Sequence, residues 1–178
     1  MDDLDRLAEL VKERNLLERE ITALIDRPAQ IGHIGEYIAS RIFRIALVES
    51  ASHKAIDGHF SDSPLKGCSV NIKWYALHEG LLDVTPDSLP DQYLVLSGPK
   101  SGVMSSRGRV RPWTIDGVFL FDAHSLISNL RTRGVELGIA CSVAQQYWQE
   151  AEVYPNQRNT ALLLSDEQRR QLSLFRAN

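Results

Sequence analysis

Two short apolar segments most constrain what this chain can fold into. They are residues 92–96 (QYLVL) and residues 117–121 (GVFLF), and turn-forming residues bound each of them. A continuous apolar run of this length is typical of a central strand whose two faces are both covered. We therefore expect a sheet that is buried between two layers of other elements.

The remaining periodicities supply more strands and the covering helices. Residues 55–60 and 68–75 are predicted strands, and residues 44–49 form either a strand or a helix end. Helices are predicted over residues 28–43, 123–133 and 142–152, with a half-buried strand at 135–140. Ser165 and Gln168 form a capping box that opens a last helix. This order indicates an α/β or α+β domain with a mixed central sheet flanked by helices.

A long helix precedes this domain. Residues 2–26 contain no Gly or Pro and carry acidic residues in the first turn. Spacings of three and four residues relate Leu7, Leu10, Leu17, Ile21 and Leu24, and Arg14 interrupts this seam. We divide the chain into an N-terminal helix (1–27) and a domain (28–178). The helix either docks on its own domain or mediates a homodimer or partner contact.

Composition favours an ordinary soluble protein. Apolar residues make up 43% and charged residues 24% of the 178 residues. No apolar run approaches the roughly 20 residues of a membrane span, and the chain opens Met1-Asp2-Asp3. We expect a cytoplasmic protein with no membrane contact, in which Cys68 and Cys141 are reduced. A net charge of −3 means that any nucleic-acid binding must come from a local patch.

Three segments carry the residues most suited to chemistry. They are the helical stretch 35–39 (GEYIA), the pair Asp57-Gly58, and the strand 70–74 (VNIKW). Because side chains alternate along a strand, Asn71 and Lys73 lie on one face. If the strands are neighbours and the helix crosses them, two carboxylates, an amide oxygen and an ammonium converge. Such a group could hold a divalent metal ion.

The order and spacing of these segments resemble the PD-(D/E)XK, or restriction-endonuclease-like, nuclease superfamily. More narrowly, they resemble a branch of small domains with GEYIA, Asp-Gly and (Q/N)IK motifs. The resemblance covers residues 35–75 and implies a restriction-endonuclease-like core. It implies that Glu36 orients metal-bound water, that Asp57 is the principal metal carboxylate, and that Lys73 is the motif lysine. Glu36, Asp57 and Asn71 would hold Mg²⁺ or Mn²⁺.

The chain departs from the superfamily pattern at two positions. Ile56 stands where the motif has proline, and Asn71 stands where it has its second acid. An asparagine keeps a carbonyl oxygen that can coordinate a cation, but it lacks the negative charge that hard cations prefer. The resemblance therefore predicts a site with weakened metal affinity.

Cations that could contact phosphates follow the strand predicted over residues 92–96. The glycine- and serine-rich residues 97–112 contain four cations and no acid. Either this is a solvated loop, or its backbone amides and arginines contact phosphates. The candidate nucleic-acid-binding residues are Lys54, Lys66, Lys100, Arg107, Arg109 and Arg111.

These observations lead to a divalent-metal-dependent nuclease that cleaves DNA, in restriction or phage defence. The alternative is a catalytically weakened nuclease-like fold that binds nucleic acid or protein, and a third possibility is a scaffold that acts through the N-terminal helix. Each site residue also has a purely structural explanation. Glu36 could be a solvated helix residue, Asp57 a turn residue, and Lys73 a strand lysine with its stem on apolar surface.

Overall fold

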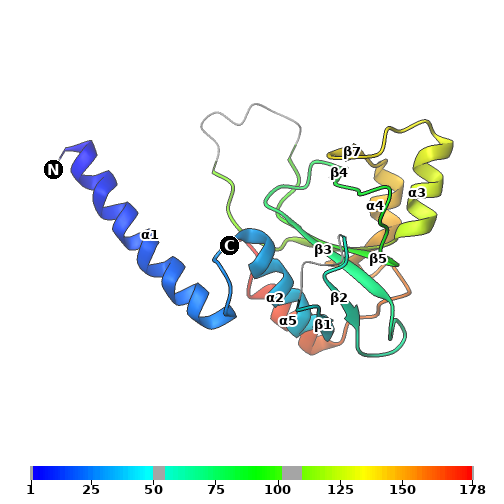
Figure 1. Ribbon diagram of the computed structural model, residues 1–178, viewed down its shortest axis with the longest axis horizontal. Helices are drawn as coiled ribbons and strands as arrows, with labels where there is room; N and C mark the ends of the chain where they lie inside the picture. The colour runs from blue at the N-terminus through cyan, green and yellow to red at the C-terminus, as the bar shows by residue number, and fades with distance from the viewer. Residues whose placement is uncertain (1, 50–54, 102–109, 178) are drawn as a thin grey trace.

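A six-stranded mixed sheet forms the centre of the molecule (Figure 1), in the strand order β1-β2-β3-β5-β6-β8. The computed structural model describes residues 2–49, 55–101 and 110–177. The strands of this sheet are β1 (Ile45–Leu47), β2 (Gly58–Phe60), β3 (Ser69–Tyr75), β5 (Gln92–Ser97), β6 (Gly117–Asp122) and β8 (Glu152–Tyr154). The central strands β3 and β5 are parallel, and every other neighbouring pair is antiparallel. The predicted mixed α+β fold is confirmed.

Helices cover both faces of the sheet, as the apolar runs predicted. The helices are α1 (Asp3–Ile25), α2 (Ile31–Phe43), α3 (Ala123–Thr132), α4 (Gln145–Ala151) and α5 (Asp166–Ser173). One core lies between the sheet and α2 with α5, and it takes Leu94 and Leu96 from β5. The second core lies under α3 and α4 and takes Tyr93 and Val95 from the same strand. Successive side chains of β5 point to opposite faces of the sheet, so this one strand contributes residues to both cores.

A glycine sets the approach of α2 to the sheet. A Cβ atom added at Gly35 would lie 3.0 Å from Cβ of Trp74 and 3.3 Å from its ring. The absence of a side chain at Gly35 therefore lets the helix backbone sit directly on β3. Glu36, the next residue, is carried to the same strand by this contact.

The N-terminal helix α1 extends away from the sheet (Figure 1). Its first turn is closed by a capping box between Asp2 and Asp5, and only Ile25 is buried. Seven of its large apolar side chains are 44–72% exposed, namely Leu4, Leu7, Leu10, Val11, Leu16, Leu17 and Leu24. Whether a second copy or a partner protein covers them stays a prediction. No helix in the described part of the chain is both long and apolar enough to cross a membrane.

Several expected boundaries were wrong. Residues 135–140 form no strand; the chain turns at Ala140, which has φ 57°, and pairing begins only at β7 (Cys141–Ser142). There the chain is held by other bonds, because the amide of Ala140 donates to Asp83 Oδ1 at 2.8 Å. Two short strands, β4 (Leu81–Leu82) and β8, were not predicted. Strand β4 pairs with β7.

The starts of α2 and β2 also differ from the sequence-based boundaries. Helix α2 begins at Ile31 with Gln30 as its N-cap, so Pro28 precedes the helix. Asp57-Gly58 is not a turn at a strand end: Gly58 is the first residue of β2, and Asp57 lies immediately before it. The strand predicted over residues 55–60 is thus only three residues long.

A side-chain clamp joins the starts of the two parallel strands. The amide and the hydroxyl of Ser69 donate to Asp91 Oδ2 at 2.7 and 2.8 Å, and the amide of Asp91 donates back to Ser69 Oγ at 2.9 Å. The amide of Ser69, followed by its hydroxyl, holds the pKa of Asp91 below its ordinary value of 3.8. These bonds fix the register at which β3 and β5 begin.

We predict that Asp91→Ala lowers the free energy of unfolding by about 1 kcal/mol at neutral pH, because Ser69 loses its acceptor. A carboxylate with a lowered folded-state pKa stabilises the fold above its unfolded-state pKa, and this contribution is lost as the pH falls through the folded-state value. The difference between variant and wild type should therefore shrink in acid. Denaturant unfolding at pH 7 and pH 3 measures it, with the exposed Asp87→Ala as control. An equal loss in both variants would contradict the clamp.

Candidate metal centre at the edge of strand β3

Asp57 binds the edge of β3 where β2 separates from it. Strand β2 pairs with β3 only at Gly58 and His59, so the amide of Ile72 has no strand partner on that side. The Asp57 carboxylate takes this place and accepts a hydrogen bond from the Ile72 amide at 2.6 Å. The Asp57 amide donates to the carbonyl of Val70 at 2.9 Å. The two bonds place Asp57 alongside Asn71.

Asn71 has a buried oxygen without a donor. Its side chain is 8% exposed, and Oδ1 is buried with no hydrogen-bond partner in the described part of the chain. A buried acceptor without a donor costs about 1–3 kcal/mol, so such groups are uncommon in folded proteins. An oxygen in this state can coordinate a cation without giving up a hydrogen bond.

Glu36 comes from α2 and forms an ion pair with Arg27. The Oε2 atom of Glu36 contacts Nη1 of Arg27, and the Glu36 side chain is 17% exposed. Arg27 lies in the connection between α1 and α2. The sequence pattern gave no reason to single out Arg27, which is nine residues before its partner. A metal ion that bound Glu36 would therefore have to compete with the guanidinium of Arg27.

Lys73 points to the same face of β3 as Asn71. Its ammonium lies 5.9 Å from the ring centroid of Tyr93, and it forms no ion pair within 4.0 Å with a described residue. Burial lowers the pKa of Lys73, while the charges of Asp83 and Asp57 act in the opposite direction. Asp83 was not predicted as part of the site. It accepts a hydrogen bond from the Tyr75 hydroxyl at 3.2 Å.

The charges of the predicted residues act on one another. Burial raises the pKa of Asp57, and the amide of Ile72 opposes this by donating to the carboxylate. The nearby charge of Glu36 raises that pKa further, while Lys73 and Arg27 lower it. Asp57 is therefore within electrostatic range of both Glu36 and Lys73, which come from two other segments. Because Glu36 raises the pKa of Asp57, a cation bound near these two carboxylates would relieve their repulsion.

The donor set fits a hard divalent cation in part. Two carboxylates and one amide oxygen are the kinds of ligand that Mg²⁺ and Mn²⁺ take. Among the residues that the structure describes, no group of three or more His, Cys, Asp or Glu side chains could hold a metal. Asn71 contributes an amide in place of a further carboxylate. The fit therefore depends on Asn71 Oδ1 and on exchange of Arg27 for the cation at Glu36.

No contact or electrostatic effect connects the described members of the predicted phosphate-contacting group with this site. Lys66 is exposed between β2 and β3, and Arg111 is exposed before β6. Lys100 lines a cavity to which none of Glu36, Asp57, Asn71 and Lys73 contributes. Lys54, Arg107 and Arg109 lie outside the described residues.

Profiles of known protein families and curated proteins contain no match to this chain. The resemblance to the PD-(D/E)XK superfamily thus stays a prediction that rests on the residues quoted above.

We predict that Asp57→Asn stabilises the metal-free protein by about 0.5–2 kcal/mol at pH 7. Because the folded-state pKa of Asp57 is raised, its ionised form destabilises the fold at pH values above that pKa, and the penalty disappears below the unfolded-state value of 3.8. The advantage of the variant should therefore narrow as the pH falls toward 4. The asparagine oxygen can still accept the bond from Ile72.

Denaturant unfolding in the presence of a chelator measures this difference. Asp62→Asn is the matched control, because Asp62 is an exposed acid paired with Arg44. If Asp57→Asn is less stable than wild type at pH 7, the ionised carboxylate stabilises the fold, and the prediction is contradicted.

Proposed function

We propose that this chain is a divalent-metal-dependent hydrolase of phosphodiester bonds in DNA. The observation that supports the proposal is that the charges of Glu36 and Lys73 both act on Asp57. Asp57 lies alongside Asn71, whose Oδ1 is buried without a hydrogen-bond partner in the described chain. A role in restriction or phage defence is part of the same proposal and rests on the sequence resemblance alone.

The four site residues have two separate roles, which are metal binding and stabilisation of negative charge. Asp57, Asn71 and Glu36 would hold Mg²⁺ or Mn²⁺. When bound there, such an ion would supply polarisation of a phosphoryl oxygen and would lower the pKa of a coordinated water molecule by several units. Lys73 places a positive charge where negative charge develops on the phosphate. Its lowered pKa, caused by burial, also brings it nearer to a range in which it can exchange a proton.

Arg27 supplies a positive charge to this site when no metal ion is bound. While Arg27 neutralises Glu36, the acid pair at the edge of β3 is partly compensated without a metal ion. A cation that takes the place of the guanidinium gains Glu36 as a ligand. Metal binding is therefore expected to require release of Arg27, and this requirement adds to the low affinity that Asn71 implies.

Plasmid cleavage tests the proposal. Supercoiled and linear DNA are incubated with Mg²⁺ or Mn²⁺ and with wild type, Asp57→Ala or Asp62→Ala. We expect cleavage by wild type and by the Asp62 control, and a rate at least about 100-fold lower for Asp57→Ala, because the principal cation ligand is lost. Cleavage that is unaffected by the Asp57 change, or no cleavage by any of the three, would refute the hydrolase.

Restoring the missing acid tests the metal site itself. We predict that Asn71→Asp raises Mg²⁺ affinity roughly tenfold or more, because affinity for hard cations grows with the number of charged ligands. Isothermal titration calorimetry measures this change. The control Asn129→Asp adds the same charge at an exposed position of α3 and should leave Mg²⁺ binding unchanged. Equal effects of the two variants would rule out a specific site at Asn71.

A second candidate function is a binding module on the same fold. Two observations favour it: Asn71 replaces an acid, and Glu36 already has a partner in Arg27. This alternative predicts no heat of Mg²⁺ binding in wild type, together with DNA affinity that falls steeply with salt concentration. Metal-dependent cleavage would exclude it.

A further inference from the structure

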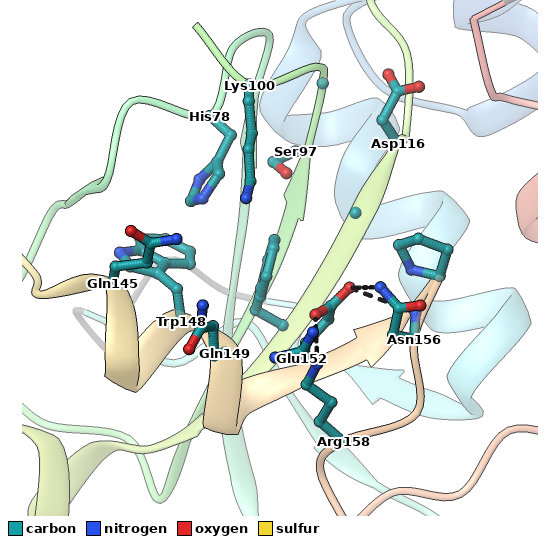
Figure 2. A pocket seen from close by; sticks show the side chains of 14 residues that line it. His78, Ser97, Lys100, Asp116, Gln145, Trp148, Gln149, Glu152, Asn156 and Arg158 are labelled. Atoms are coloured by element: carbon teal, nitrogen blue, oxygen red, sulfur yellow. Dashed lines mark hydrogen bonds and ion pairs between the residues drawn. The ribbon is translucent and has the colours of Figure 1, made fainter. Parts of the chain in front are cut away.

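A cavity of about 260 Å³, separate from the candidate metal centre, lies on the α4 side of the sheet (Figure 2). It is built from the segment after β3, from the end of β5 and the start of β6, from α4, and from the segment around β8. None of the four predicted metal-centre residues lines it. Its volume is just under the range of cavities that hold drug-sized ligands, which suits one small molecule rather than a polymer strand.

Aromatic rings form one wall of this cavity. The His78 ring stacks on Phe119 with centroids 5.2 Å apart, and it meets the edge of Trp148 at 4.5 Å. Phe119 and Trp148 pack edge to face at 5.0 Å, which holds the wall in place. The indole nitrogen of Trp148 is buried and has no hydrogen-bond partner in the described chain. Such a wall offers a flat ligand apolar surface.

The acids at the cavity already have partners. Glu152 Oε1 accepts hydrogen bonds from the amide and the side chain of Asn156, and Oε2 lies 3.4 Å from Nε of Arg158. Figure 2 shows this group on the side of the cavity opposite Lys100. Asp116 accepts a hydrogen bond from the Thr114 hydroxyl at 2.7 Å. The carboxylates are therefore poorly suited to attract a cationic ligand.

Four polar side chains at the cavity have no such partners. His78 and Lys100 point into it, and Gln145 and Gln149 border it from α4 (Figure 2). None of the four side chains has a hydrogen bond or ion pair with a described residue. Burial, followed by the charge of Lys100, lowers the pKa of His78, so the imidazole is uncharged at neutral pH. Asp116 Oδ1 lies 3.9 Å from Nε of Arg176, so this acid also has a cationic partner. Among the described residues that line the cavity, the charge without a partner is thus the positive charge of Lys100.

We propose that this cavity binds a small organic anion with a flat ring, the chemistry of a nucleoside monophosphate. The anionic group meets Lys100, the ring lies against the aromatic wall, and the amides of Gln145 and Gln149 bond to polar atoms on the ring edge. This proposal is independent of metal-dependent hydrolysis, because the two sites share no residue.

Calorimetric titration with adenosine 5′-monophosphate, in the presence of a chelator, tests the proposal. We expect one site per chain, and an affinity at least about tenfold lower for Lys100→Ala, because a charge-assisted hydrogen bond is lost. Gln149→Trp should abolish binding, since a bulky side chain at this exposed position of α4 would fill the cavity. Lys12→Ala removes the same charge from α1 and should bind like wild type, and so should Asp57→Asn.

Adenosine and inorganic phosphate separate the two parts of the ligand. Each should bind at least about tenfold more weakly than the nucleotide, because each lacks one of the contacts. Phosphate or adenosine binding as tightly as the nucleotide would overturn the proposal. It would also be overturned by absence of nucleotide binding at millimolar concentration, or by equal affinities of wild type, Lys100→Ala and Gln149→Trp.

Discussion

The hydrogen bond from the Ile72 amide to the Asp57 carboxylate is the contact on which the candidate site depends. It exists because β2 pairs with β3 at only two positions and then separates from it. The free strand edge that results must be satisfied, and a carboxylate satisfies it. The same bond fixes Asp57 beside Asn71, whose own oxygen has no donor in the described chain. A local break in the pairing of β2 with β3 thus creates a polar site beside an inner strand of an apolar sheet.

Nearby positive charges partly offset the cost of placing acidic side chains beside β3. Asp57 is within range of one acid, Glu36, and of two cations, Lys73 and Arg27. Burial raises the pKa of the acid and lowers that of the lysine, so each charged form is held at a cost in stability. Groups kept in this condition are more common at functional sites than in structural ion pairs. Arg27 compensates Glu36, so the fold can form before any ligand binds.

The sequence predicted the elements that depend on apolar periodicity. The buried strands β5 and β6, the long helix α1 and the capping box of α5 were all foreseen, because their signals are local. The strand predicted over 135–140 was wrong, because its alternating pattern was outweighed by a turn and by a bond to Asp83, which is 57 residues away. Arg27 and the cavity around His78 were also missed. Their roles depend on contacts between distant segments, and no single stretch of sequence carries a signal for them.

The most direct test of the account is where Mn²⁺ binds in crystals of the metal-free protein soaked in that ion. Anomalous diffraction should place one ion between the carboxylate of Asp57 and Oδ1 of Asn71, at coordination distances of roughly 2.0–2.4 Å. Glu36 should then have left Arg27 for the ion. An ion elsewhere, or no ion at the edge of β3 at millimolar Mn²⁺ with the Glu36–Arg27 pair intact, would contradict the proposed metal centre.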